Sequence, residues 1–189
     1  DIAAVGPKML KLAANIADGV ILSWPSVMFL EQAIPAFKQH VMQSGRNPND
    51  VAIIVQTGFE ITKNRERTLE KMKDQMAVIY SVPGFDRVLQ SKKFNVAEII
   101  THVKTALNSE QILSAGGWTR EFRERADWEA VRAAIPLDLI DQVAIVGPST
   151  KIRATLENYH NLGVTHIFIP PPMETTCEEY SSLVKSIML

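Results

Sequence analysis

The residues best suited to bind an anion lie near the start of the chain, in the segment Val5-Gly6-Pro7-Lys8. An apolar stretch precedes this segment and a helical pattern follows it, so it marks a turn from a strand into a helix. The free N–H groups and the dipole of a helix N-terminus favour an anion, and a glycine lets a phosphate approach closely. Because Pro7 has no N–H group, Gly6, Lys8 and Met9 would supply the donors. Taken alone, such residues more often form a plain strand-to-helix turn, so both interpretations stay open at this point.

Polar and aromatic side chains follow two further apolar segments. Ser23 and Trp24 come directly after a short apolar run, and Gln56 and Thr57 lie late in the β-branched segment from Val51 to Ile61. In a barrel of parallel strands, side chains at the carboxyl ends of the strands face the ligand. A hydroxyl, an indole and an amide at these positions could contact a substrate or a cofactor. The simpler alternatives are a loop hydroxyl, a half-buried aromatic and polar residues that mark where a strand emerges.

A second strand-to-helix turn, Gly147-Pro148-Ser149-Thr150, repeats the first one. Here Ser149 or Thr150 is best interpreted as a helix cap.

No other pattern of reactive side chains indicates a catalytic centre. Histidines 40, 102, 160 and 166 are dispersed, and the single cysteine, Cys177, has no partner at metal-ligand spacing. The Gly-x-Ser-x-Gly sequence of a nucleophilic serine is also missing. We therefore predict no metal site, and the catalytic residues stay unknown.

The elements that must position these residues alternate along the chain. In the first predicted helix Met9, Leu12, Ala13 and Ile16 recur at helical spacing, and in the helix after residue 64 Leu69, Met72, Met76 and Ile79 line one face while Lys73 faces away. We predict strands at 2–5, 20–22, 51–61, 143–146 and 165–169, and helices at 7–16, 29–42, about 65–79, 151–162 and 180–189, with a mostly helical insertion at about 84–136.

This alternation, with short apolar strands of the buried type, predicts an α/β fold in which helices cover a parallel sheet. Residues 1–189 are interpreted as a single domain. The strand tail at Ile2 and the non-methionine first residue, Asp1, indicate that the sequence starts inside a domain.

Composition excludes several classes of protein. The chain is 46% hydrophobic and 22% charged, as expected of a globular domain, and its 20 Lys and Arg residues nearly balance 21 Asp and Glu residues. The basic residues are scattered, so we expect no nucleic-acid partner. Apolar runs fall far short of the roughly 20 residues that cross a bilayer, so we expect no membrane span. A single cysteine favours a cytoplasmic location.

Several blocks resemble the luciferase-like superfamily of flavin and deazaflavin oxidoreductases. The first are Ala4-Val5-Gly6-Pro7-Lys8-Met9-Leu10, Ala17-Asp18-Gly19-Val20-Ile21 and Gly45-Arg46-Asn47-Pro48-Asn49-Asp50. Asp141-Gln142-Val143-Ala144-Ile145-Val146-Gly147 and, after a helix, Gly163-Val164-Thr165-His166-Ile167 are similar to the family's last strand-helix-strand unit. The order of the blocks looks closest to the deazaflavin-dependent methylenetetrahydromethanopterin reductase branch.

The resemblance implies a (β/α)8 TIM barrel of the luciferase-like type, of which this chain is about the C-terminal half, since such barrels need about 250 residues. It implies an oxidoreductase that uses coenzyme F420 or FMN and transfers a hydride with a small organic substrate. It assigns the turn Val5-Gly6-Pro7-Lys8 to the cofactor phosphate. We predict that Ala4 and Ser23 also bind the cofactor, and that Trp24, Gln56 and Thr57 bind the substrate. At 147–150 the chain departs from the family pattern, with Lys151 in place of an acid.

Two alternatives stay open. One is an FMN-dependent monooxygenase, and the other is a non-catalytic half-barrel that binds a partner or self-associates. Half a barrel exposes two sheet edges, so we expect a homo-oligomer or a companion segment.

Overall fold

Four short parallel strands form the main sheet of the computed structural model, which describes residues 1–169 and 176–187. They are β1 (Ile2–Ala3), β2 (Gly19–Ser23), β3 (Ala52–Gln56) and β6 (His166–Phe168), in the order β1-β2-β3-β6. All three pairings are parallel, so the carboxyl ends of the strands lie at one edge of the sheet. This arrangement confirms the predicted α/β class with a parallel sheet.

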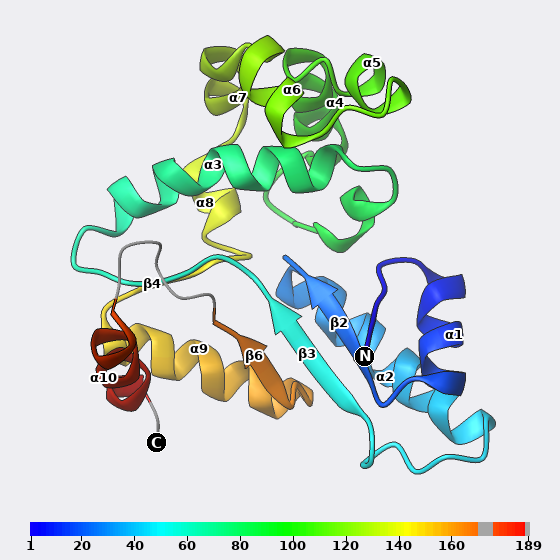
Figure 1. Ribbon diagram of the computed structural model, residues 1–189. Coiled ribbons are helices and arrows are strands. Elements are labelled where there is room, and N and C mark those ends of the chain that lie inside the picture. Colours follow the sequence, from blue (N-terminus) through cyan, green and yellow to red (C-terminus); the bar gives the residue numbers. More distant parts are fainter. Residues whose placement is uncertain (170–175, 188–189) are drawn as a thin grey trace.

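Helices cover one face of this sheet. They are α1 (Pro7–Ile16), α2 (Val27–Gln43), α9 (Ser149–Leu162) and α10 (Cys177–Ile187). Helix α1 packs against α2, α2 against α9, and α9 against α10 (Figure 1). The helix-facing side chains of the two central strands, Val20, Leu22, Ile53 and Val55, are at most 1% exposed. The core therefore lies between the sheet and these helices.

The opposite face of the sheet is more exposed, and we call it the open face. Successive side chains of a strand point to opposite faces, and residues in register in a parallel pair share a face. Ile21 and Ile54 are half-buried, and Gln56 is exposed, in contrast to their fully buried neighbours. By this alternation and the strand register, the open face comprises Ala3, Gly19, Ile21, Ser23, Ala52, Ile54, Gln56, His166 and Phe168.

The strand predicted at Val51 to Ile61 is divided in two. After β3 the chain breaks at Thr57-Gly58 and continues as β4 (Phe59–Ile61), which pairs in parallel with β5 (Ile145–Gly147) in a separate two-stranded sheet. The strand predicted at 143–146 thus forms, shifted slightly, beside β4 instead of in the main sheet. A glycine within an apparent strand often marks such a break, and here it accommodates a close side chain from the core.

The long helix α3 (Arg65–Ser81) separates the sheet from a helical segment (Figure 1). This segment contains the 3-10 helix η1 (Phe85–Val88) and helices α4 (Val96–Ala106), α5 (Ser109–Ser114), α6 (Thr119–Arg125) and α7 (Trp128–Ala134), followed by α8 (Leu137–Ile140). Helices α4, α7 and α8 pack on α3, and α4 packs on α7. The interpretation of residues 1–189 as one domain, with an insertion at about 84–136, stays a prediction.

Helix α1 buries a different face from the predicted one. Ala13 is buried as expected, but Leu10 and Ala14 join it, whereas Leu12 is 43% and Ile16 is 68% exposed. The two alanines allow α1 to lie close to its neighbours, whereas Met9, Leu12 and Ile16 point outward.

Candidate functional site

Side chains from three neighbouring strands meet at the carboxyl edge of the main sheet. Ser23 of β2 lies in register with Gln56 of β3, and Gln56 lies in register with Phe168 of β6. The Ser23 hydroxyl donates a hydrogen bond to Oε1 of Gln56, with 3.3 Å between the two oxygens. The structure thus brings together two of the residues that were predicted to contact a ligand, and it adds an aromatic ring to the same row.

The predicted anion-binding turn follows β1 at this edge. Gly6 is the N-cap of α1, with φ −108° and ψ 156°, and Pro7 occupies the first turn. The first intrahelical bond runs from the Leu10 N–H to the Gly6 carbonyl, so the N–H groups of Lys8 and Met9 precede it. A Cβ on Gly6 would meet nothing within 4 Å, and the first turn of α1 carries no acidic side chain. The turn therefore leaves room for an anion and places no like charge against it.

Ala4 and Val5 position this turn. Ala4 is 2% exposed, and its N–H donates to the Ile21 carbonyl at 3.1 Å, which continues the sheet beyond β1. Val5 is half-buried, whereas Lys8 is exposed. Since β1 pairs with β2, the chain leaves the sheet beside the end of β2, where Ser23 lies.

Trp24 and Thr57 lie in the core instead of facing the barrel mouth, contrary to our expectation. Trp24 is 2% exposed and Thr57 is 3% exposed. The Thr57 hydroxyl donates a hydrogen bond to the Val143 carbonyl, so it ties the end of β3 to the segment before β5. Each of these residues directly follows the last residue of its strand, and the Trp24 ring packs beside Gly58 and beside Met72 of α3.

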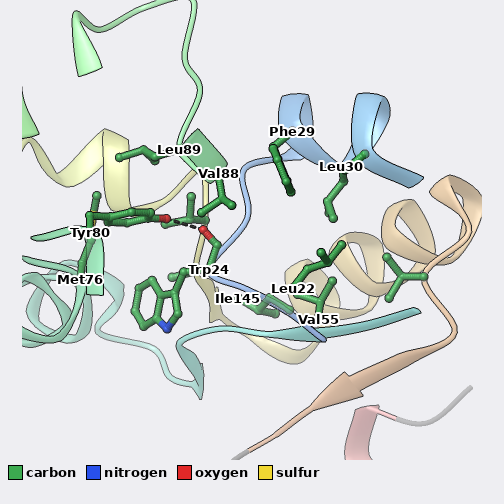
Figure 2. Close-up of a cluster of buried hydrophobic side chains, with 14 of the residues drawn as sticks. Leu22, Trp24, Phe29, Leu30, Val55, Met76, Tyr80, Val88, Leu89 and Ile145 are labelled. Atoms are coloured by element: carbon green, nitrogen blue, oxygen red, sulfur yellow. Dashed lines mark hydrogen bonds between the residues drawn. The ribbon is translucent and has the colours of Figure 1, made fainter. Parts of the chain in front are cut away.

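The backbone at Trp24 adopts a left-handed conformation, with φ 50°, which is unusual for a bulky residue. Its N–H donates to the Gln56 carbonyl at 2.7 Å, and its carbonyl accepts a hydrogen bond from the Tyr80 hydroxyl of α3. Figure 2 shows the Trp24 ring beside Tyr80 and Met76, with the Tyr80 hydrogen bond dashed. Complete burial, with a smaller contribution from Tyr159, raises the pKa of Tyr80 well above its usual value, so the hydroxyl keeps its proton.

The second turn provides neither the predicted cap nor a free cation. Pro148 is the N-cap of α9 and makes no side-chain capping bond, while Ser149 lies inside the helix. Asp141 forms ion pairs with Lys151 and with Arg65. Burial, and then the charge of Arg65, lower the pKa of Lys151. Because both cations are paired with the single carboxylate of Asp141, we interpret this turn as a structural junction.

Two kinds of feature are missing from the part of the chain that the structure describes. In residues 1–169 and 176–187, no three His, Cys, Asp or Glu side chains gather as a metal-binding group. Nor does that part contain a helix with the length and apolarity needed to cross a membrane.

Comparison with known families identifies the chain. Residues 1–166 match the profile of the luciferase-like monooxygenase family. This chain belongs to the luciferase-like monooxygenase family. The match confirms the resemblance drawn from the ordered sequence blocks.

The chain is similar in sequence to several reductases. The chain is 25% identical to the 5,10-methylenetetrahydromethanopterin reductase of Methanopyrus kandleri over 181 residues. This alignment covers 96% of the chain and 47% of the relative. It is 24% identical to the enzyme of the same name from Methanolobus tindarius, in an alignment that covers 96% of the chain and 50% of the relative. The chain thus spans about half the length of the relatives that it matches.

Solved structures show the same luciferase-like fold. The coenzyme F420-dependent tetrahydromethanopterin reductase from Methanopyrus kandleri superposes with a TM-score of 0.61 at 24% identity, over 98% of this chain and 46% of that one. An F420-dependent secondary alcohol dehydrogenase superposes with the same TM-score at 13% identity, over 98% of this chain and 48% of that one. The predicted fold class, about half of a luciferase-like (β/α)8 barrel, is confirmed.

Two further exposed side chains of β6 were not among the predicted site residues. His166 and Phe168 are exposed on β6, and both belong to the open face that carries Ser23 and Gln56. The Nδ1 atom of His166 lies 2.8 Å from the Thr165 hydroxyl. The period-two alternation of β6 could have located them, had its register with β3 been known.

Proposed function

We propose that this chain is the cofactor-phosphate half of a coenzyme F420-dependent oxidoreductase, which transfers a hydride between the coenzyme and a small organic substrate. The observation that carries the proposal is the Gly6 turn, because it combines an open glycine, a helix N-terminus and no acidic side chain at the carboxyl edge of a parallel sheet. In the complete protein we expect a methylenetetrahydromethanopterin-type reductase.

The relatives favour the deazaflavin over FMN. Three relatives that share 22% to 25% identity with the chain are 5,10-methylenetetrahydromethanopterin reductases, and the solved Methanopyrus kandleri enzyme is described as dependent on coenzyme F420. The FMN-dependent monooxygenase stays a weaker alternative. When bound, a deazaflavin supplies the hydride chemistry, and the protein supplies binding and orientation.

The residues of this chain would then act as follows. The N–H groups of Gly6, Lys8 and Met9 hold the phosphate of the coenzyme, and the exposed Lys8 side chain adds a positive charge. Ser23 and Gln56 present a hydroxyl and an amide to the ligand at the end of the neighbouring strands. Ala4, Val5 and Pro7, which were predicted to bind the cofactor, would position the backbone of the turn. Trp24 and Thr57 are not included, since they are buried.

The experiment is a titration of the full-length protein with coenzyme F420 and with 5-deazariboflavin, which has a deazaflavin ring and no phosphate. Gly6→Ala places a methyl group where the phosphate approaches but meets no protein atom within 4 Å. We expect it to weaken binding of the coenzyme about tenfold, the loss of roughly one charge-assisted hydrogen bond, and to leave deazariboflavin binding unchanged.

A matched pair of lysines controls for general charge. Lys8 lies in the first turn of α1 and Lys11 lies one turn later, and both are exposed. Lys8→Ala should weaken coenzyme binding more at low salt than at high salt, and Lys11→Ala should change it little. Uptake of FMN but not of the deazaflavin would overturn the choice of cofactor. Uptake of neither would favour the non-catalytic half-barrel, whose partners and self-association remain predictions, as does a cytoplasmic location.

A further inference from the structure

A cavity of about 390 Å³ lies between α2 and α9, the helices that cover one face of the main sheet. One face of α9 lines it with Lys151, Thr155 and Tyr159, the first residues of α2 line it as well, and Gln90 and Asp141 complete the lining. Because α2 and α9 pack against each other, the cavity lies within this half-barrel and not at one of its open edges. Its volume falls in the range of small-molecule sites, about 300–1,000 Å³.

The N-terminus of α2 brings backbone donors to this cavity. Val27 and Met28, the first two residues of this 17-residue helix, belong to the lining. The N–H group of Phe29 donates to the Ser26 hydroxyl oxygen at 3.3 Å, and that of Leu30 donates to the Ser26 carbonyl at 3.1 Å. Within the described residues, the N–H groups of Val27 and Met28 are left without a partner. They form the positive end of the helix dipole, and the first turn of α2 carries no acidic side chain.

The Tyr159 hydroxyl is a second, independent donor. Tyr159 lines the cavity and is only 2% exposed, yet its hydroxyl makes no hydrogen bond to any residue that the structure describes. Burial alone raises the pKa of Tyr159 to about 12, so the hydroxyl keeps its proton at neutral pH. Tyr159 also raises the pKa of Tyr80, whose hydroxyl bonds the Trp24 carbonyl two residues before Ser26. This interaction places the Tyr159 phenol near the segment that leads into α2.

The charges around the cavity are positive on balance. Lys151 and Arg65 both pair with the single carboxylate of Asp141, which leaves one positive charge in excess within this cluster. The Gln90 side chain accepts a hydrogen bond from Gln32 through Oε1 at 3.2 Å, so its own amide N–H groups remain as donors. Free backbone N–H groups, a buried phenol and an excess of positive charge together match the oxygens of a small anion.

We propose that the cavity between α2 and α9 binds a small oxyanion, held by the N–H groups of Val27 and Met28 and by the hydroxyl of Tyr159. The ammonium group of Lys151 adds an electrostatic attraction. A phosphate group and a carboxylate group share this chemistry, since both present charged oxygens to N–H and O–H donors. The site is separate from the Gly6 turn, which follows β1, and the inference does not depend on the proposed function.

The test is a calorimetric titration of the full-length protein with inorganic phosphate and with malonate, a dicarboxylate. The parent protein carries Gly6→Ala, so that an anion at the Gly6 turn does not contribute. Tyr159→Phe removes the hydroxyl and keeps the ring, and we expect it to weaken binding of one of the two anions about tenfold.

Val27→Pro tests the backbone donors in the same parent. It removes one N–H group at the first position of α2, where proline is well tolerated. The preceding Ser26 already has the extended backbone that a residue before proline adopts, with φ −72° and ψ 155°. We expect this variant to weaken binding of the same anion about three- to tenfold.

Tyr180→Phe provides the matched control. It removes the same kind of hydroxyl from α10, where the Tyr180 hydroxyl donates to the Ile169 carbonyl at 2.6 Å, outside the cavity. It should leave both dissociation constants unchanged. Melting curves identify any loss that comes from unfolding, and Tyr159→Phe should melt close to the parent, because its hydroxyl has no partner among the described residues to lose.

Each outcome has a distinct meaning. Weaker phosphate binding by Tyr159→Phe and Val27→Pro assigns the cavity to a phosphate group, and weaker malonate binding assigns it to a carboxylate group. If the parent binds neither anion, if Tyr159→Phe binds both as tightly as the parent, or if Tyr180→Phe loses as much, the inference is overturned. The coenzyme titration of Gly6→Ala decides the proposed function separately, since the Gly6 turn does not line this cavity.

Discussion

Replacement of Gly58 by alanine tests how the core directs side chains toward the site. A Cβ at this position would lie 2.8 Å from the Met72 Sδ and 2.8 Å from Cη2 of Trp24, closer than non-bonded atoms approach. Met72 is flexible and can give way, but Trp24 cannot. Its backbone N–H is bonded to the Gln56 carbonyl at 2.7 Å, its carbonyl accepts from Tyr80, and its side chain is 2% exposed.

The expected cost follows from two opposing effects. Overpacking a well-packed core costs about 1–3 kcal/mol. Removing a glycine from a position without a left-handed backbone returns about 0.4–1 kcal/mol, because the unfolded chain becomes less flexible. We therefore expect Gly58→Ala to lower the free energy of unfolding by about 1–2 kcal/mol.

The assay is urea unfolding of the full-length protein, followed by tryptophan fluorescence. Gly6→Ala is the control, since its new methyl group meets no atom within 4 Å and its φ of −108° suits alanine. It should unfold within about 0.5 kcal/mol of the wild type. If Gly58→Ala unfolds at the same urea concentration as this control, then the Trp24 ring does not occupy the space above Gly58, and our account of its burial is wrong.

Three further predictions concern buried polar groups. Burial raises the pKa of Tyr159 to about 12, so between pH 10 and 12 the unfolded chain loses this proton while the folded chain keeps it. The free energy of unfolding should therefore fall by about 1.4 kcal/mol per pH unit as the pH rises through this range. In urea titrations at alkaline pH, Tyr159→Phe should remove this part of the pH dependence. Tyr80→Phe leaves the buried Trp24 carbonyl without its donor and should cost about 1–3 kcal/mol in the same assay, and an unchanged midpoint would contradict the bond. Lys73→Met removes the hydrogen bond from Nζ to the Arg132 carbonyl, 2.9 Å away, and should lower the free energy of unfolding by about 1 kcal/mol. If replacing an exposed lysine by methionine lowers it equally, Lys73 does not join α3 to α7.

The order and type of the elements could be predicted because short β-branched runs and helical periodicity are local signals. The division of the strand at 51–61 could not, since Gly58 at the break lies against the Trp24 ring, which comes from a distant part of the sequence. Nor could the burial of Lys73, which is 8% exposed despite its place among charged neighbours. Its amine reaches a carbonyl of α7, a helix more than 50 residues away in sequence, and only the tertiary structure shows that contact.

The assignment of the site residues could have been sharpened by applying alternation strictly. Ser23 and Trp24 are adjacent, as are Gln56 and Thr57, so the two members of each pair cannot line the same face of an extended strand. At Trp24 the left-handed backbone ends the extended strand, and the buried ring packs beside Gly58 and beside Met72 of α3. Each pair therefore divides into one residue that faces a ligand and one that holds the strand end in place. Changes at Ser23 or Gln56 should alter ligand binding with little effect on unfolding, and changes at Trp24 or Thr57 should do the reverse.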